Sequence, residues 1–427
     1  MSTIFAPASG AGRAAVTVLR LSGPDSAQIV AALAGALPPP RRASLRPLRH
    51  DGVLLDRALV LWFPGPASYT GEDGAELHLH GGPAVLAAVS DALLALGARP
   101  AEPGEFTRRA FLHGRMELTA AEGLADLIAA ETEAQRRQAL LQAEGGLAAR
   151  QAGWAQELLR LLARQEAFIE FEAEDQPPTL DAEVAVDGAR LRGELAALLA
   201  EGERGERLRE GVAIAILGAP NAGKSSLLNA LAGRDAAIVS PQAGTTRDVV
   251  EVRLVLAGVP VTLADTAGLR EAADEIEAEG IRRALRRAET AEIRLLVLAG
   301  EPDAATLALA SEGPGAVLVQ NKADLGGAPH PGALPVSARD GTGLEALRAR
   351  LAAEVGARAG ASGLTRPRHR AAVAEAVAWL DRLPDAPMPE LRAEALRGAV
   401  QALARLTGRV DAEAVLDLVF GEFCIGK

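Results

Sequence analysis

Hydrophobic and polar residues alternate with different periods along the chain, and each period predicts a different kind of element. Over about the first 114 residues, short alternating runs and helical patterns are separated by loops such as Pro38–Pro40. The runs predict strands at 16–21, 58–63 and 76–80, and the helical patterns predict helices at 26–33 and 84–96. This mixture indicates an α+β domain over residues 1–114.

From about residue 117 to 172, leucines recur at three-, four- and seven-residue spacings with charged residues between them. Such spacing predicts long amphipathic helices. The segment Glu174–Pro178 interrupts the pattern, a helical run resumes near Val186, and residues 365–420 are helical again. We therefore expect one helical domain in two parts, residues 115–206 and 355–427.

Between these two parts, from Val212 to about Leu351, strands are followed by loops and then by helices. This rhythm is typical of an α/β nucleotide-binding domain, here residues 207–354, inserted into the helical domain. The predicted fold class is therefore multidomain α/β and α. It has an N-terminal α+β domain, a discontinuous helical domain and an inserted doubly wound α/β domain.

A phosphate-binding loop begins the inserted domain, where the predicted strand Val212–Leu217 runs directly into Gly218-x-x-x-x-Gly223-Lys224-Ser225. The glycines let backbone N–H groups converge on phosphate oxygens, and the following helix contributes the positive end of its dipole. Lys224 is expected to neutralise the β- and γ-phosphates, and Ser225 is expected to bind Mg²⁺.

Further motifs follow in the order that a GTP-binding domain of the Ras-like type requires. Thr246 offers a hydroxyl to Mg²⁺, Asp265 reaches the ion through water, and the Gly268 amide senses the γ-phosphate. Asp324, in Asn321-Lys-Ala-Asp, can accept two hydrogen bonds from a guanine edge, which adenine cannot donate. The predicted GTP-binding residues are Asn221, Ala222, Gly223, Lys224, Ser225, Ser226, Ser240, Pro241, Gln242, Ala243, Gly244, Thr245, Thr246, Asp265, Thr266, Ala267, Gly268, Asn321, Lys322, Ala323, Asp324, Ser337, Ala338 and Arg339.

The residue after Gly268 is Leu269, where many small GTPases carry a glutamine that orients the attacking water. Leucine cannot orient water, so hydrolysis must draw on another residue, a cation or a partner. Asn221, inside the phosphate loop, could place an amide oxygen beside the phosphates or could simply stabilise a turn.

The composition indicates the cellular compartment and restricts the kinds of partner that the protein can bind. Only three of the 45 basic residues are lysines, and Lys224 and Lys322 complete nucleotide-binding motifs while Lys427 ends the chain. A net charge of −11 argues against nucleic acid held by the general field, so an RNA substrate would need a local arginine patch or a basic partner. A single cysteine, Cys424, excludes an intrachain disulfide. With no apolar run of membrane-spanning length and no export signal, we expect a cytoplasmic protein.

Several longer segments extend beyond the nucleotide motifs. They are Ala11–Gly23, Ser68–Asp73, His80–Pro83, Pro103–Thr107, Ala110–Leu112, Gly244–Asp248, Asp265–Arg270 and the terminal Phe423–Lys427. With these segments the chain resembles, over essentially its full length, the MnmE (TrmE) family of bacterial tRNA modification GTPases. The terminal Cys-Ile-Gly-Lys is the most specific of them, since other GTPases of this class lack it.

The resemblance implies that the N-terminal domain binds a reduced folate, 5,10-methylene- or 5-formyl-tetrahydrofolate, and forms a homodimer. Arg20, Glu76 and Arg115 match the folate contacts of the family, and Lys427 is expected to reach the pocket from the tail. The family usually has lysine at the position of Arg115, so the arginine keeps the charge and changes the geometry.

The resemblance also implies a potassium ion beside the phosphates, held by Asn221, Ser240, Gln242 and Thr245. The ion would supply the positive charge that an arginine finger gives elsewhere. Glu277 matches the family glutamate that positions the attacking water and is the predicted catalytic residue. Without the resemblance, Glu277 would be taken for a solvated acid, because Glu275 and Glu279 are close by.

In function, the resemblance implies that GTP hydrolysis accompanies modification of C5 of the wobble uridine in certain tRNAs. The expected partner is the flavoprotein MnmG, which carries FAD, in a heterotetramer. Two rivals remain open: a regulatory ribosome-assembly GTPase, which shares the Asn-containing loop, and a self-assembling mechanical GTPase. The ribosome-assembly class usually appends a basic RNA-binding module, and the mechanical class does not explain the N-terminal domain.

Three further groups of polar residues allow more than one interpretation. Glu76, His78 and His80 alternate on one strand face, which could hold a metal only with help from a third element. Cys424 could be a nucleophile, but no base lies near it in sequence. Arginine stripes at 282–287 and 366–370 are expected to be solvated helix faces.

Overall fold

The structure is a computed structural model. It describes residues 2–10, 12–170, 180–219, 221–235, 251–265, 291–300 and 315–408, and also residues 416, 419–421, 423 and 426. The chain separates into two compact units, residues 1–125, 142–156 and 400–427, and residues 126–141 and 157–399.

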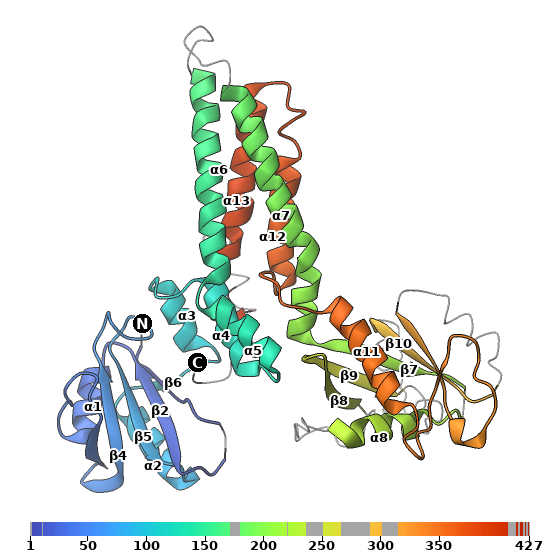
Figure 1. The fold of residues 1–427 in the computed structure, drawn as a ribbon. Helices are drawn as coiled ribbons and strands as arrows, with labels where there is room; N and C mark the ends of the chain where they lie inside the picture. The colour runs from blue at the N-terminus through green and yellow to red at the C-terminus, as the bar shows by residue number, and fades with distance from the viewer. Residues whose placement is uncertain are drawn as a thin grey trace, which may run out of the picture. The chain divides into compact units, whose positions relative to one another are not determined.

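The first unit contains a six-stranded sheet in the order β3-β4-β5-β2-β1-β6. Neighbouring strands are antiparallel except β1 and β6, which are parallel. Helices α1 and α2 cover one face, and the core lies between them and the sheet (Figure 1). The elements are β1 (Ile4–Pro7), β2 (Val16–Ser22), α1 (Ser26–Ala34), β3 (Ser44–His50), β4 (Val53–Phe63), β5 (Gly74–His80), α2 (Pro83–Ala95), β6 (Arg99–Pro100) and α3 (Glu105–Leu112).

The other face of this sheet carries exposed apolar side chains. Leu45, Leu59 and Val16 are 67%, 43% and 52% exposed, although they stand on three different strands. Leu45 is paired with Leu59 across β3 and β4, so apolar side chains adjoin on this face. Large exposed apolar patches usually mark an interaction surface.

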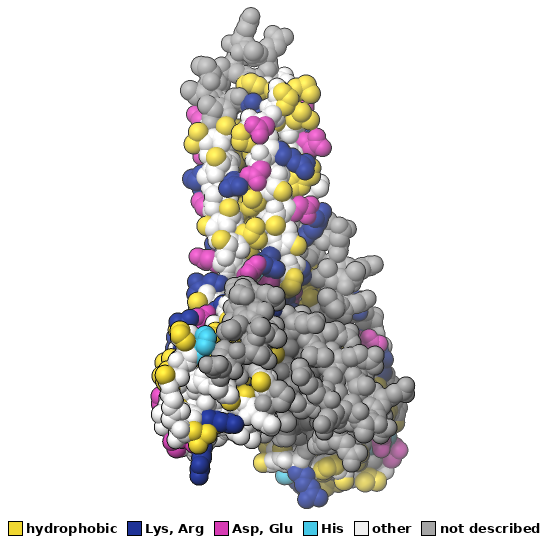
Figure 2. Space-filling view, turned by 90° about the vertical axis from the view of Figure 1, so that its right-hand side faces the viewer, with side chains coloured by type: hydrophobic (Ala, Val, Ile, Leu, Met, Phe, Trp, Pro, Cys, Tyr) yellow, Lys and Arg dark blue, Asp and Glu magenta, His cyan; other side chains and the backbone are white. Residues whose placement is uncertain are grey.

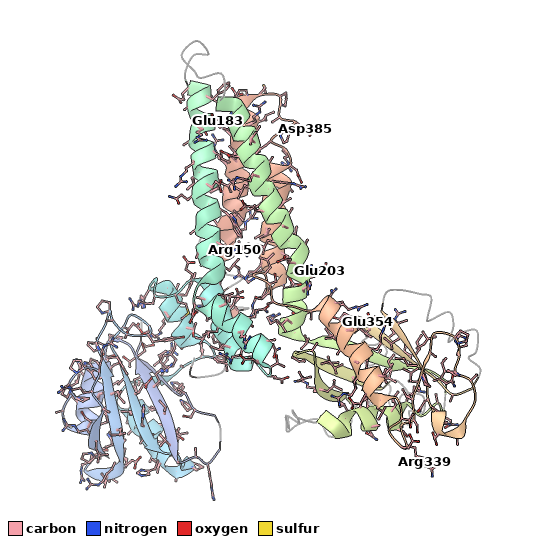
Figure 3. The ribbon with its side chains drawn as sticks, viewed as in Figure 1. Arg150, Glu183, Glu203, Arg339, Glu354 and Asp385 are labelled. Carbon is pink, nitrogen blue, oxygen red and sulfur yellow. The ribbon has the colours of Figure 1, made fainter. Side chains whose placement is uncertain are left out.

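A four-helix bundle forms much of the second unit (Figure 1). Its helices are α6 (Gly146–Glu170), α7 (Leu180–Glu210), α12 (Pro367–Leu380) and α13 (Pro389–Ala404), of which α6 and α13 also have residues in the first unit. The bundle buries leucines such as Leu158, Leu191 and Leu195, and the Trp379 ring fills the space beside Gly398. Figure 3 labels Glu183 and Glu203 at different levels of α7.

Ion pairs join the bundle helices at their surfaces. Arg192 contacts Asp381 at 2.8 Å, and Arg164 contacts Asp187 at 3.5 Å. On the bundle face that Figure 2 shows, basic and acidic side chains are interspersed, so this face is mixed in sign. Among the residues that the structure describes, no helix is both long and apolar enough to cross a membrane.

The second sheet has the order β12-β11-β10-β7-β9-β8, and its strands are parallel except at the β8–β9 hairpin. The inner strands are largely buried, as expected for a sheet covered on both faces. Its elements are β7 (Val212–Leu217), α8 (Lys224–Asp235), β8 (Glu251–Leu256), β9 (Val259–Asp265), β10 (Ile293–Leu298), β11 (Ala316–Gln320), the 3₁₀ helix η3 (Ala323–Leu325), β12 (Leu334–Pro335) and α11 (Leu344–Arg358). The strand predicted at 212–217 is confirmed.

The α4–α5 corner (residues 126–138) binds both connections of this α/β domain. It joins α4 (Leu118–Ala129) to α5 (Glu133–Ala143). Gln135 donates to the Arg209 carbonyl at 2.9 Å, near the end of α7. Gln138 donates to the Gly205 carbonyl at 3.1 Å and accepts from the Ser362 amide at 3.1 Å. Since Gly360 N also donates to the Arg204 carbonyl at 3.0 Å, the incoming and outgoing chains lie side by side.

The expectation of a solvated arginine face at 366–370 is wrong for Arg366. Its side chain is 8% exposed and pairs with Asp126 of the α4–α5 corner at 2.8 Å. Pro367 is the first residue of α12 and Arg366 precedes it in an extended conformation, so Arg366 does not belong to the helix face. Arg370 lies on the helix and pairs with Glu203 and Glu206.

Candidate functional site

The phosphate loop lies where β7 meets α8. Gly218 has a φ of +147°, and a Cβ there would stand 2.2 Å from the carbonyl oxygen of Val297 on β10. Lys224 is 5% exposed, and its ammonium donates to the carbonyls of Gly218 and Ala219 at 2.9 and 2.8 Å. The lysine side chain is therefore folded into the loop whose amides would face phosphate.

Asn321 connects three of the predicted nucleotide motifs. Its side-chain amide donates to the Ala222 carbonyl at 2.8 Å, and its oxygen accepts from the Ala338 amide at 3.2 Å. Gly223, with a φ of +85°, lies so close that a Cβ would be 2.4 Å from the Asn321 nitrogen. The sequence analysis placed Asn321 in the base motif and did not predict this bracing role. The partners of Asn321 are far away in sequence, so no local pattern indicates them.

The predicted base-reading carboxylate is held from one side. The Ser337 hydroxyl donates to Asp324 Oδ1 at 2.9 Å, and the Asp324 side chain is 18% exposed. Arg339 is 85% exposed, 4.0 Å from Asp324 Oδ2, and lies at the edge of the domain in Figure 3. The structure thus brings the Asn321–Asp324 and Ser337–Arg339 segments together, as a guanine pocket requires.

The remaining nucleotide residues are only partly described. Asn221 is exposed with a φ of +63°, a conformation that asparagine tolerates better than most residues, and Ser225 and Ser226 are exposed at the start of α8. Asp265 ends β9, and its backbone is paired with Ile216 beside the phosphate loop. The predicted residues Ser240, Pro241, Gln242, Ala243, Gly244, Thr245, Thr246, Thr266, Ala267, Gly268 and Glu277 lie outside the described residues.

A second candidate site is a cavity of about 360 Å³ in the first unit, called here the N-terminal pocket. Arg20, Glu76 and Arg115, the three described residues of the predicted folate set, all line it. Arg20 pairs with Glu76 at 3.1 Å, and its guanidinium stands 5.4 Å from the centroid of the Tyr69 ring. The pocket therefore combines fixed charges with an aromatic wall.

Sequence reasoning assigned no role to Tyr69 or Phe106, which also line the N-terminal pocket. Both stand in segments that carried the family resemblance, Ser68–Asp73 and Pro103–Thr107. Membership of these segments is the sequence feature that could have indicated a role for the two residues. The Tyr69 hydroxyl lies 2.8 Å from the Thr107 hydroxyl. Burial raises the pKa of the Tyr69 phenol, so it stays protonated at neutral pH.

The alternating Glu76, His78 and His80 make separate contacts. His78 Nε2 lies 3.3 Å from Glu76, whereas His80 Nδ1 lies 2.7 Å from Asp56. The part of the chain that the structure describes contains no group of three or more His, Cys, Asp or Glu side chains placed to hold a metal ion. Although burial opposes ionisation, hydrogen bonds from His80 lower the pKa of Asp56.

The described residues of the C-terminal tail pack on the N-terminal sheet and its neighbours. Phe423 and Phe420 are buried with Leu118 in one apolar cluster, and their rings are 5.9 Å apart. Gly426 has a φ of +101°, and a Cβ there would lie 2.1 Å from the Pro7 carbonyl oxygen at the end of β1. The predicted Lys427 contact and Cys424 lie outside the described residues.

Two protein families match this chain, one over the N-terminal domain and one over the remainder of the chain. Residues 3–115 match the family described as GTP-binding protein TrmE N-terminus, and residues 118–424 match the MnmE helical domain. The tRNA modification GTPase MnmE of Gluconacetobacter diazotrophicus is 58% identical over 437 residues, covering 99% of this chain and 98% of the relative. That of Granulibacter bethesdensis is 54% identical over 440 residues, covering 100% and 99%.

A solved structure, the G domain of the T. maritima FeoB iron transporter, is 22% identical, with a TM-score of 0.26. The match covers 34% of this chain and 98% of that domain, and at this score it carries no weight in the assignment. The near full-length identity and the two family matches are sufficient by themselves. This GTP hydrolase belongs to the MnmE family of tRNA modification GTPases.

Proposed function

We propose that this chain is a potassium-activated GTPase that works with the flavoprotein MnmG to modify C5 of the wobble uridine of certain tRNAs. The product would be an aminomethyl or carboxymethylaminomethyl group, with its carbon taken from a reduced folate. The observation that carries the proposal is that one chain holds both the hydrogen-bonded residues of the candidate nucleotide site and a charged pocket lined by Arg20, Glu76 and Arg115.

The residues around the phosphate loop fit a magnesium ion. Ser225 is an exposed residue at the start of α8, and β9 ends at Asp265, whose backbone is paired with Ile216 of β7. Hydroxyl and carboxylate oxygens are the ligands that Mg²⁺ prefers. Ser225 and Thr246 would hold Mg²⁺ directly and Asp265 through water. Lys224 would turn from the loop carbonyls to the phosphates and orient them for attack.

A potassium ion would be held by Asn221, Ser240, Gln242 and Thr245, and when bound it adds positive charge beside the phosphates. The exposed Asn221 in its left-handed conformation supports this, because its side chain is not buried in the fold. The carboxylate of Glu277 would hold and orient the attacking water, the task that Leu269 cannot perform.

We expect GTP hydrolysis to require potassium and to collapse when sodium replaces it, because the smaller ion does not fit the same oxygen donors. Asn221→Ala should lower the potassium-stimulated rate, whereas Asn229→Ala, the same change on α8, should not. Initial rates of phosphate release in the two salts measure this. Equal rates in potassium and sodium would remove the ion from the proposal.

Glu277→Ala should lower kcat by roughly 10²-fold or more while GTP affinity stays nearly unchanged, since only water positioning is lost. The matched controls are Glu275→Ala and Glu279→Ala, which remove neighbouring carboxylates. Single-turnover hydrolysis and nucleotide titration separate the two quantities. Normal turnover in Glu277→Ala would return this residue to a solvated acid.

The N-terminal pocket suits a reduced folate. Its cations Arg20 and Arg115 complement the carboxylates of the ligand, Glu76 can accept from the pterin N–H groups, and Tyr69 offers an aromatic surface. A folate bound there supplies a one-carbon unit. Lys427 would add a cation from the tail, which the position of Gly426 against Pro7 supports.

We further propose a homodimer through the N-terminal domain and a heterotetramer with MnmG, which carries FAD. The apolar face with Leu45, Leu59 and Val16 supports the homodimer. The proposed division is 1–114, 115–206, 207–354 and 355–427. The start of α4 at Leu118 and of β7 at Val212 support the first two boundaries to within a few residues.

Nucleoside analysis of tRNA from cells lacking this chain tests the proposal. We expect the C5-substituted wobble uridine to disappear and to return with the wild-type gene, but not with a Lys224→Ala gene. A ribosome-assembly GTPase would instead leave the uridine modified and disturb the ribosomal subunit profile, and that result would overturn the proposal.

A further inference from the structure

One wall of the N-terminal pocket is a loop rather than a strand. Residues 67–72, called here the pocket loop, lie in the connection between β4 and β5 and contribute Ala67, Ser68, Tyr69 and Thr70 to the lining. A loop forms a defined binding wall only if contacts outside it fix its conformation. Those contacts identify the residues on which the pocket depends.

The pocket loop is fixed through Glu72. This carboxylate accepts from the Ser22 hydroxyl at 2.8 Å, and the Ser22 oxygen lies 2.6 Å from the hydroxyl of Thr70. On its other side Glu72 accepts from Arg109 of α3 at 2.9 Å. Ser22 and Thr70 themselves line the pocket, so one carboxylate joins the lining to the helix beneath it.

Arg109 is the buried centre of this arrangement. Its side chain is 4% exposed, yet its guanidinium donates to Glu72, to Glu105 at 2.8 Å and to the Ser2 carbonyl at 2.9 Å. Arg99 pairs with Glu105 as well, so two cations face two carboxylates. We call Arg99, Arg109, Glu72 and Glu105 the α3 ion cluster.

Glu105 is charged at neutral pH. Burial disfavours the Glu105 carboxylate, but hydrogen bonds from Arg99, the Glu102 amide and Arg109 hold the pKa of Glu105 at about 2. A planar guanidinium can hold two carboxylates at once, which a lysine ammonium does less well. Removing either carboxylate leaves the same buried cation with one partner fewer.

We infer that Arg109 is a positioning residue, which through Glu72 holds the pocket loop in the conformation that binds ligand. Arg109 is not among the lining residues and acts through another side chain. The inference rests on the proposed function in taking the ligand to be a reduced folate. The contacts that carry it do not depend on the ligand.

The two carboxylates of the cluster provide a matched pair of variants. Glu72→Ala and Glu105→Ala each remove one partner of Arg109, so both should lower the melting temperature of the full-length protein. Of the two, only Glu72 belongs to the pocket loop and accepts from Ser22, which lines the pocket. If the fraction of molecules with an ordered loop falls to about a tenth, the apparent Kd for 5-formyl-tetrahydrofolate rises about tenfold in Glu72→Ala. In Glu105→Ala it should stay within about twofold.

Calorimetric titration with 5-formyl-tetrahydrofolate and amide hydrogen exchange of residues 67–72 in the unliganded protein are the two measurements. We expect faster exchange in Glu72→Ala alone. Equal losses of affinity in both variants, or unchanged affinity in Glu72→Ala, would overturn the inference and leave the cluster a source of stability only. If the wild-type protein binds no folate while exchange rises in Glu72→Ala alone, the positioning role stands and the proposed folate chemistry fails.

Discussion

Asp324→Asn is expected to move nucleotide preference from GTP toward xanthosine triphosphate by about 10⁴-fold, the range for a buried polar pair left unmatched. The Asp324 carboxylate would accept the N–H groups of guanine, and the Ser337 hydroxyl donates to this carboxylate at 2.9 Å. An asparagine amide can still accept from guanine N1–H, but it offers a donor where the exocyclic amine of guanine also donates. Xanthine presents a carbonyl in place of the exocyclic amine, so it matches the amide.

Competition of the two triphosphates for the protein, measured with a fluorescent analogue, gives both affinities. Asp340→Asn is the matched control, because it makes the same change in an exposed carboxylate of the same loop, which accepts from the Thr342 amide. It should leave GTP affinity within about twofold, as surface changes usually do. Retained GTP affinity in Asp324→Asn, with no gain for xanthine, would show that another residue reads the base.

Deleting residues 424–427 is expected to abolish tRNA modification and to weaken folate binding, while GTP affinity is unchanged. The described residues of the tail are the reason for this expectation. Phe423 is buried beside Phe420, and Gly426 lies against the Pro7 carbonyl. A docked tail can carry Lys427 to the N-terminal pocket, whereas a free terminal lysine would remain in solvent.

A single substitution tests whether the tail must pack against Pro7 or must only be present. Gly426→Ala places a methyl 2.1 Å from the Pro7 oxygen and requires a φ of +101°, so it should weaken folate binding much as the deletion does. Gly421→Ala is the control, because no atom lies within 4 Å of its Cβ position. Modification of tRNA at the wild-type rate by the truncated protein would show that the tail has no part in the reaction.

The backbone around the described part of the candidate nucleotide site could be predicted from sequence because its parts are local. A strand that ends in glycines before Lys224 determines its own backbone path, and the Asn321–Asp324 motif follows its strand in the same way. The spacing of leucines likewise predicted the long helices, because a helix buries one face at a fixed period. These elements need few distant contacts to take their form.

Other features depend on partners far away in the chain. Arg366 was expected in solvent, but Asp126, 240 residues away in sequence, draws it into the interior. Nothing in the sequence near Arg109 shows that Glu72 is its partner, and the bracing role of Asn321 likewise requires Ala222. Local sequence patterns predict the period of an element and the path of its backbone. They do not predict contacts between side chains that are far apart in sequence, because folding of the whole chain brings these together.

The hydrogen bond between Gly360 and Arg204 links ligand binding to the stability of the helices around the insertion. While the inserted domain is folded, the chain segments that enter and leave it lie side by side. The folded domain then connects α7 and α12 in the way that a short turn would. If it unfolds, that turn becomes a flexible loop of roughly 150 residues, and closing such a loop costs about 3 kcal/mol more than closing one of a few residues. A nucleotide that keeps the domain folded is therefore expected also to stabilise α7 against α12.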